Sequence, residues 1–378
     1  MPPKVPFHRP SVSERERAYL LEALEGRYWG SGPWVERLEA ALQNLYGREA
    51  VVVSSGTAAL HLAYMLLLGK EGGEVIVPTW TFTATASEVV HAGGVPVVVD
   101  VGPSLHLTVE QVEAALSPRT RGVVVMHYAG APAPVREIVA FCRERGLWVV
   151  EDACHAVPAY VEGRLCGTFG DIATLSFHAT KPVAAGQGGA LLLSDPVLAE
   201  KARRLRTHGI RRTPGQPWSY EVESLGWNYR LSDFQAAVAL AQIEQLTELW
   251  QARKRLAVLY QALLQDYPWL RPYPVPAADS SAWHLFPVFW SGATAQQRDA
   301  LLYRLYAQGF ELSVHYKPLH RHKAYQPYLP SGQTFPIAEK AYNEVFSLPL
   351  WPGLPDEAIF ELVARLGKET HFPSFPTS

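Results

Sequence analysis

The sequence has few cysteines, no long block of one charge and no long apolar run. Its three cysteines form no CxxC pair, so neither a disulfide framework nor a metal site is indicated. Lys plus Arg (34) nearly balance Asp plus Glu (36), which argues against nucleic-acid or membrane partners. The N-terminus lacks the apolar stretch of a signal peptide, and no apolar run could span a bilayer. We therefore expect a soluble, cytoplasmic protein with reduced thiols.

The first two thirds of the chain read as an α/β sheet. Short runs rich in β-branched residues alternate with helical patterns over residues 57–68, 108–116 and 135–146. We expect seven strands at residues 51–53, 74–78, 95–101, 122–128, 147–152, 172–177 and 189–195. Apolar runs of this kind are typical of a sheet buried on both faces, which binds ligands at the carboxyl ends of its strands.

The remainder reads as a second unit. A long helical pattern covers residues 231–265, and after a proline-rich turn come a strand at 283–290, a helix at 295–308, a strand at 310–314 and a final helix at 356–366. With 378 residues and 48% hydrophobic composition, the chain is long enough for two domains. We predict a large α/β domain with an N-terminal arm over residues 1–249 and a smaller α+β domain over residues 250–378.

Three segments that follow strand ends carry the chemistry. The predicted strand 147–152 closes on Asp152, and Lys181 follows Ser176 by five residues in SFHATKPVAAGQGGALLL. SSGTAAL opens a helix, so the amides of Gly56, Thr57 and Ala58 would point at an anion. A lysine amine, a buried carboxylate and a phosphate cradle are what pyridoxal phosphate requires, for an imine, a pyridinium nitrogen and a phosphate. The sequence therefore predicts a pyridoxal phosphate site.

Each of these residues also has a plainer interpretation. SSGTAAL can be a simple Ser/Thr helix cap, and Asp152 can be the N-cap of a helix over residues 153–156. His155 lies where it could contact the cofactor's phenolic oxygen or ring, but a lone histidine is more often a packed or surface residue. An exposed lysine is normally only a solvated charge.

Motifs along nearly the whole chain carry a family resemblance. They include YWGSGPWVERLEAAL, PTWTFTATASEVVHAGGVPVVVDV, EDACHA, GTFGDIATLSFHATK, LGWNYRLSDFQAAVALAQIEQL and VHYKPLH. With them the chain resembles the DegT/StrS family of pyridoxal phosphate-dependent sugar aminotransferases. This resemblance implies aspartate aminotransferase fold type I, an α/β/α sandwich around a mostly parallel, mixed seven-stranded sheet.

The resemblance also implies roles for individual residues. Lys181 carries the internal aldimine, Asp152 faces the pyridine nitrogen, and Gly56, Thr57 and Ser176 hold the phosphate. Phe82 stacks on the cofactor ring and His155 lies near it. Asn228 matches an asparagine that reaches the phosphate from the neighbouring subunit, which implies a homodimer with shared active sites. Positions near the substrate match Gln187, Arg230, His315 and Tyr316.

The implied reaction is transfer of an amino group from glutamate or glutamine to a nucleotide-linked keto-sugar. Gln187 stands where the family commonly has an acidic residue, and Pro182 where Asn or His is common, which puts the identity of the sugar in doubt. Two alternatives stay open. One is a sugar dehydratase or lyase on the same fold, although related dehydratases carry histidine at the position of Lys181. The other is a regulatory protein that keeps the fold and the cofactor.

Overall fold

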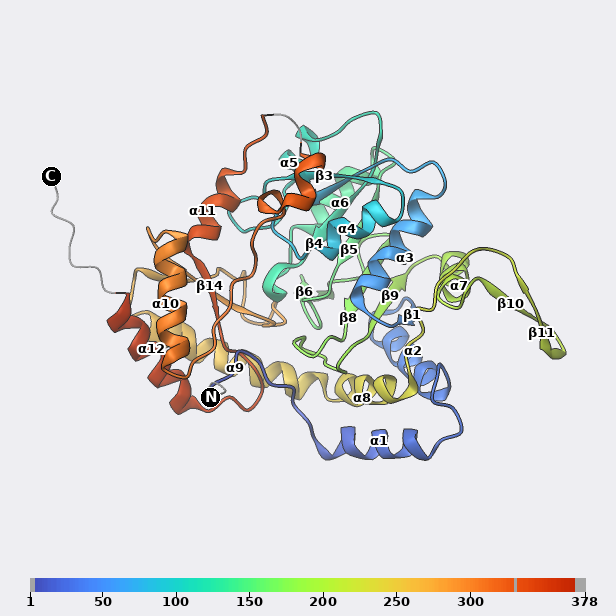
Figure 1. Ribbon diagram of the computed structural model, residues 1–378, viewed down its shortest axis with the longest axis horizontal. Coiled ribbons are helices and arrows are strands. Elements are labelled where there is room, and N and C mark those ends of the chain that lie inside the picture. Colours follow the sequence, from blue (N-terminus) through green and yellow to red (C-terminus); the bar gives the residue numbers. More distant parts are fainter. Residues whose placement is uncertain (1–3, 330–331, 371–378) are drawn as a thin grey trace.

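The structure, a computed structural model, describes residues 4–329 and 332–370 and is built around a seven-stranded sheet (Figure 1). The outer residues of both predicted domains, 1–3 and 371–378, and residues 330–331 lie outside the described part. The sheet order is β1-β9-β8-β5-β4-β2-β3. Strand β9 runs antiparallel to its neighbours β1 and β8, whereas β8, β5, β4, β2 and β3 pair in parallel. Each predicted strand forms one strand of this sheet: β1 (Glu49–Val53), β2 (Glu74–Pro78), β3 (Val95–Val99), β4 (Thr120–Met126), β5 (Trp148–Asp152), β8 (Ile172–Ser176) and β9 (Gly189–Leu193).

Successive side chains along a strand point to opposite faces of the sheet. Because these side chains are apolar on both faces, helices cover both faces. Val51 and Val53 pack into the cluster that contains the apolar residues of α3 (Gly56–Leu68), α4 (Ala84–His91) and α7 (Pro196–Leu205). Ala50 and Val52 pack on the opposite side, against α2 (Pro33–Tyr46) and α8 (Asp233–Glu244). Further along that face lie α5 (Val109–Ala114) and α6 (Val135–Arg143). The predicted α/β/α sandwich is confirmed.

The C-terminal part adds a three-stranded antiparallel sheet, β12 (Leu270–Pro272), β13 (Phe286–Trp290) and β14 (Val345–Leu348). It shares an apolar cluster with α9 (Leu246–Leu264), α10 (Ala295–Ala307) and α12 (Asp356–Glu369), and α11 (Pro336–Glu344) precedes β14. The predicted strand at 310–314 is wrong. Phe310 pairs with Val5 and Ser313 pairs with Ser347, each as an isolated bridge. No strand forms because the two residues pair with different segments of the chain.

The predicted continuous helix over 231–265 is also wrong, because it breaks at Gln245. In an unbroken helix the Gln245 N–H would bond to the carbonyl of Ala241. Instead the Gln245 side-chain amide donates to that carbonyl (2.9 Å) and to Glu16 Oε1 (3.2 Å), and its backbone N–H turns to Gln242 O (3.2 Å). The side chain has replaced the backbone donor, so α8 ends and α9 begins there. Helix α1 (Glu14–Glu25), which carries Glu16, packs along α8.

Two helices begin on carboxylates supplied from distant parts of the chain. Asp233 Oδ1 accepts from the amide of Gly32 (2.7 Å) at the start of α2, and Asp100 Oδ2 accepts from Ile337 N (2.9 Å) at the start of α11. Neither helix has a side-chain cap from its own N-cap residue, so these acids satisfy amides that a helix leaves without partners.

A hairpin that the sequence did not predict, β10 (Ile210–Thr213) with β11 (Gln216–Val222), projects from the right of the molecule in Figure 1. A shorter pair, β6 (Tyr160–Val161) with β7 (Arg164–Leu165), follows β5.

Candidate active site

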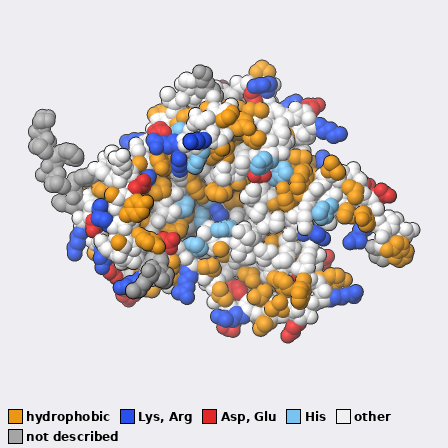
Figure 2. All heavy atoms as spheres, viewed as in Figure 1, with side chains coloured by type: hydrophobic (Ala, Val, Ile, Leu, Met, Phe, Trp, Pro, Cys, Tyr) orange, Lys and Arg blue, Asp and Glu red, His pale blue; other side chains and the backbone are white. Residues whose placement is uncertain are grey.

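One cavity of about 380 Å³ collects most of the predicted site residues at the carboxyl ends of the parallel strands. Figure 2 shows several histidine side chains near the middle of the visible face. Of the residues predicted from the sequence, the cavity is lined by Gly56, Thr57, Phe82, Asp152, His155, Ser176, Lys181, Gln187, His315 and Tyr316. Its lining does not include Ala58, Asn228 or Arg230.

Asp152, the last residue of β5, is held as an acceptor by two donors. Its Oδ2 accepts from the Thr85 hydroxyl (2.8 Å) and its Oδ1 from the Cys154 amide (3.2 Å), and the residue is 3% exposed. The helix that Asp152 could have capped does not form, because residues 153–159 make turns. Asp152 is therefore a buried carboxylate at the cavity wall, suited to face a cationic group.

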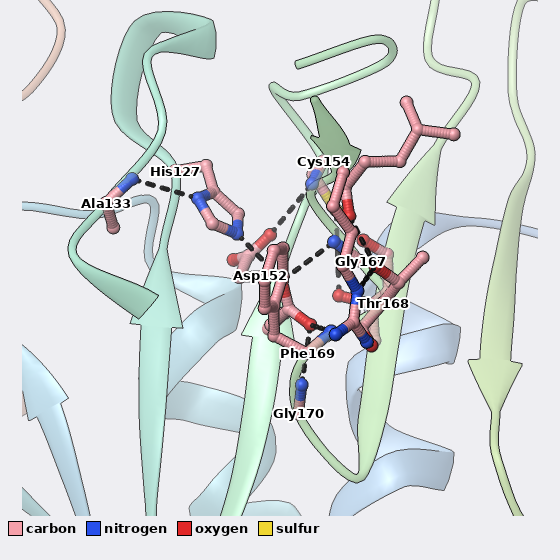
Figure 3. Close-up of polar contacts among 12 residues, drawn as sticks. His127, Ala133, Asp152, Cys154, Gly167, Thr168, Phe169 and Gly170 are labelled. Atoms are coloured by element: carbon pink, nitrogen blue, oxygen red, sulfur yellow. Dashed lines mark hydrogen bonds and ion pairs between the residues drawn. The ribbon is translucent and has the colours of Figure 1, made fainter. Parts of the chain in front are cut away.

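The neighbouring Glu151 anchors the loop that follows β7, and Figure 3 shows the loop residues Gly167, Phe169 and Gly170. Its side chain lies on the opposite face of the strand from that of Asp152, because successive side chains along a strand alternate. Its Oε2 accepts from the Gly167 amide (2.7 Å), and its Oε1 accepts from the amides of Phe169 (2.6 Å) and Gly170 (2.7 Å). The Nε2–H of His127 donates to Oε2 at 3.1 Å. These four donors hold the Glu151 side chain and so fix the end of β5 next to Asp152.

His127 completes this anchor through its second ring nitrogen. The amide of Ala133 donates to His127 Nδ1 (3.1 Å), which assigns the ring proton to Nε2, the nitrogen that faces Glu151. Both His127 and Glu151 are fully buried. The strand end that carries Asp152 is thus fixed by a buried network in which every polar atom of the two side chains has a partner.

The start of α3 forms the predicted anion cradle, with one amide already used. Ser55 is the N-cap, and its hydroxyl accepts from the Ala58 amide (3.0 Å). The helix-cap interpretation therefore holds for Ser55, and Ala58 lies outside the cavity lining. A Cβ on Gly56 would lie 2.9 Å from Ser176 Cβ, so glycine is required for α3 to start this close to β8. The amides of Gly56 and Thr57 have no partner within the helix and face the cavity together with Ser176.

Lys181 lies in the loop between β8 and β9 and lines the cavity. Burial lowers the pKa of its amine below the usual range, and the neighbouring Cys154 and Asp152 oppose this only in part. A lysine with a lowered pKa is more often unprotonated at neutral pH, and the unprotonated amine is the nucleophile.

Aromatic and imidazole side chains form the rest of the wall. Phe82 is 52% exposed, with its ring centroid 6.1 Å from that of Tyr316. The Tyr316 hydroxyl bonds to His155 Nε2 (2.9 Å). Burial holds the pKa of His155 well below its usual value and that of His315 at about 3, so both rings are neutral at neutral pH.

Polar atoms without partners also face this region. His155 Nδ1 and His284 Nδ1 are buried and lack a hydrogen-bond partner within the described residues, and their ring centroids lie 4.2 Å apart. Buried polar groups normally have partners. The two unpaired imidazole nitrogens, the free helix amides and the buried carboxylate fit a polar, ring-shaped cofactor such as pyridoxal phosphate.

Asn228 and Arg230 lie together outside the cavity. Both are exposed, and Arg230 Nε donates to Asn228 Oδ1 (3.1 Å). The Asn228 backbone pairs with Thr207 beside the β10–β11 hairpin. This chain does not bring the two residues to its own site.

Sequence reasoning missed several residues that line the cavity, notably Phe7, Thr85, Cys154 and His284. Thr85 had a signal, because it belongs to the Thr-rich segment that follows β2. Phe7 and His284 had none, because their positions depend on how the N-terminal segment and the C-terminal part pack.

Within residues 4–329 and 332–370, no group of three or more His, Cys, Asp or Glu side chains is arranged to hold a metal ion. No helix in these ranges is both long and apolar enough to cross a membrane.

Comparison with known proteins finds similarity over nearly the whole chain. The profile of the DegT/DnrJ/EryC1/StrS aminotransferase family matches residues 10–367. Helicobacter pylori PseC, an aminotransferase involved in the biosynthesis of pseudoaminic acid, superposes with a TM-score of 0.92 at 27% identity, over 97% of this chain and 99% of PseC. The aminotransferase TlmJ from Streptoalloteichus hindustanus superposes with a TM-score of 0.89 at 34% identity, over 97% of this chain and 98% of TlmJ. DesI, solved in the presence of its TDP-sugar product, superposes with a TM-score of 0.87 at 28% identity, over 98% of this chain and 93% of DesI.

Proposed function

The chain belongs to the DegT/DnrJ/EryC1/StrS aminotransferase family, and from this premise we propose that it transfers an amino group from glutamate or glutamine to a nucleotide-linked keto-sugar. The observation that carries the proposal is the convergence of Lys181, Asp152 and the start of α3 on one cavity. The nucleotide-linked substrate is proposed by analogy with DesI and its TDP-sugar product.

Pyridoxal phosphate, when bound, supplies an electron sink that stabilises negative charge at the carbon losing its proton. In this proposal Lys181 holds the cofactor through its amine. Asp152 would keep the pyridine nitrogen protonated, and it is oriented by the hydrogen bonds that Thr85 and the Cys154 amide donate to it. The amides of Gly56 and Thr57 and the hydroxyl of Ser176 would hold the phosphate, and Phe82 would cover the ring.

The same lysine would move the proton. Once displaced by an amino donor, the Lys181 amine can take the proton from the donor's α-carbon in the first half-reaction, and in the second half-reaction it can deliver a proton to the sugar carbon. Its lowered pKa suits both steps, because an amine that is partly unprotonated can accept a proton and release it again. Gln187, His315 and Tyr316 line the same cavity and are proposed to contact the substrates.

We also propose that the enzyme is a homodimer whose sites are shared. The β10–β11 hairpin and the segment after it expose Trp218 (79%), Tyr220 (54%) and Leu225 (88%), and apolar side chains so exposed are typical of a contact surface. Asn228 and Arg230 lie at the base of this hairpin and outside their own cavity, where they could reach a partner's site.

A mixing experiment tests the shared site. Lys181→Ala and Asn228→Ala should each be nearly inactive alone. Unfolded together and refolded, they should regain activity, because a mixed dimer has one site with Lys181 from one subunit and Asn228 from the other. No recovery in proven mixed dimers would contradict the proposal.

An absorbance titration tests the reaction. The purified protein should show a visible band from cofactor bound to Lys181, and glutamate should convert it to a near-ultraviolet band with one equivalent of 2-oxoglutarate released. Lys181→Ala should lose the band and all turnover, whereas Lys201→Ala, an exposed lysine on α7, should keep both. A band that neither glutamate nor glutamine changes would sink the assignment as an aminotransferase.

A further inference from the structure

The N-terminal segment, residues 4–13, crosses the molecule as a strap that is fixed at both ends. At one end Val5 N donates to Gly309 O (3.0 Å), and Glu311 N donates to Val5 O (3.0 Å). At the other end Gln242 Nε2, on α8, donates to Ser11 O (3.0 Å). The strap therefore joins the C-terminal part of the chain to a helix that covers the central sheet.

Between these anchors the strap passes over the loop that carries Lys181. Residues 8–11 of the strap and residues 179–182 of the loop face each other across a narrow cavity of about 10 Å³, which is roughly the least that a single water requires. The strap thus closes one side of the active site.

Phe7, within the strap, forms part of the wall of the active-site cavity. Its amide donates to Glu311 Oε2 (3.1 Å), and Trp351 Nε1 donates to the carbonyl of Pro6 (3.2 Å). Its ring stacks on the imidazole of His315, with centroids 5.2 Å apart and planes 28° apart. Backbone and ring are thus both held in place.

His315 is fixed by Phe7 on one side and by a hydroxyl on the other. Its Nδ1 bonds to Ser347 Oγ (3.0 Å), on β14. Burial keeps the ring neutral, with a pKa of about 3. The Phe7 ring and the His315 ring therefore form one continuous, uncharged wall of the cavity.

Phe7 and Phe82 both line the cavity, and Phe82 is assigned to the cofactor ring in the proposed function. The Phe7 ring is then left to face the substrates. A sugar ring presents a face of C–H groups that packs well on an aromatic ring, whereas glutamate is a flexible chain with two carboxylates and little apolar surface to offer.

We propose that Phe7 is a specificity-determining residue whose ring packs against the C–H face of the sugar acceptor and holds His315 in place beside it. This inference rests on the proposed function. It predicts that loss of the ring weakens the reaction with the sugar far more than the reaction with the amino donor.

The test measures the two half-reactions separately by stopped-flow absorbance, with glutamate as donor and TDP-linked 3-keto and 4-keto hexoses as acceptor probes. Phe7→Ala should raise KM for the sugar about tenfold, equal to ~1.4 kcal/mol. The rate constant with glutamate and the dissociation constant for pyridoxal phosphate should stay within twofold of wild type. Phe7→Tyr, which keeps the ring, should restore the sugar KM, and Phe7→Leu should not. Val12→Ala, at a 60% exposed position of the strap, is the matched control.

Two results would overturn the inference. The first is a sugar KM in Phe7→Ala within twofold of wild type. The second is a parallel loss of both half-reactions and of cofactor affinity, which would mean that Phe7 only supports the fold. Wild-type protein that transfers no amino group to either probe while converting with glutamate would instead contradict the keto-sugar proposal, and this inference with it.

Discussion

Replacing Glu151 by glutamine should destabilise the protein strongly, because the change leaves two buried donors without acceptors. The glutamine amide group must take the place of one carboxylate oxygen. In place of Oε1 it leaves the amides of Phe169 and Gly170 unpaired, and in place of Oε2 it leaves Gly167 N–H and His127 Nε2–H unpaired. Each buried unsatisfied donor costs roughly 1–3 kcal/mol, so the expected loss is about 2–6 kcal/mol.

A change of ring tautomer cannot repair this site. If His127 accepted at Nε2, its proton would move to Nδ1 and confront the Ala133 amide, which already donates there at 3.1 Å. Urea unfolding at pH 7, followed by tryptophan fluorescence, measures the loss as a lower midpoint. The control is Glu144→Gln, a side chain that is 76% exposed, where a change within ~0.5 kcal/mol is expected.

The pH dependence of the difference follows from the pKa of Glu151. Burial alone would raise this pKa, but His127 and the loop amides outweigh burial and hold it below the usual 4.5. A carboxyl with a lowered folded-state pKa stabilises the protein above its unfolded pKa and loses that contribution as pH falls through the folded pKa. The difference in unfolding free energy between wild type and Glu151→Gln should be constant from pH 8 to 5 and should shrink in stronger acid. A gap under 1 kcal/mol at pH 7, or one that widens in acid, would refute the reasoning.

Three further changes are informative. Thr85→Val removes the 2.8 Å hydroxyl donor of Asp152, and because a hydrogen bond to a charged group is worth ~1.5–3 kcal/mol, cofactor affinity should fall by at least about tenfold in a pyridoxal phosphate titration. Gly56→Ala places a Cβ 2.9 Å from Ser176 Cβ, so the same titration should show weaker binding, with unchanged affinity counting against the proposed phosphate cradle. Burial lowers the pKa of His106 to about 3. Between pH 6.5 and 3 the unfolded chain therefore binds a proton at His106 that the folded chain does not, and this lowers the free energy of unfolding by ~1.4 kcal/mol for each unit that the pH falls. His106→Gln should remove this part of the pH dependence, and an unchanged slope of unfolding free energy against pH would contradict the reasoning.

The seven strands of the central sheet were predictable because each is a short, mainly apolar run that is largely buried. The placement of Lys181 and Asp152 in one cavity followed from the same pattern, since the carboxyl ends of parallel strands meet at one edge. The structure adds what local pattern does not contain. The sequence SSGTAAL allows the Ala58 amide to donate either to the cofactor phosphate or to the Ser55 hydroxyl. In the structure it donates to Ser55.

The parts that the sequence did not predict depend on contacts between distant segments. The break at Gln245 arises because its side chain meets Glu16 on α1, and helical spacing alone carries no sign of that contact. Phe7 reaches the cavity because Val5 pairs beside Phe310. These outcomes are set by tertiary packing, to which short-range propensity contributes little.

The carboxylate of Asp233 at the start of α2 bears on the order of events while the chain is being synthesised. Gly32 and Asp233 are 201 residues apart, so a ribosome adding ~5–20 residues per second needs about 10–40 s to make the acid after the helix. During that interval α2 has no partner for its first amides other than water. Its final docking must wait for α8 to emerge, and a nascent chain shorter than about 233 residues presents this helix to chaperones in an uncapped form.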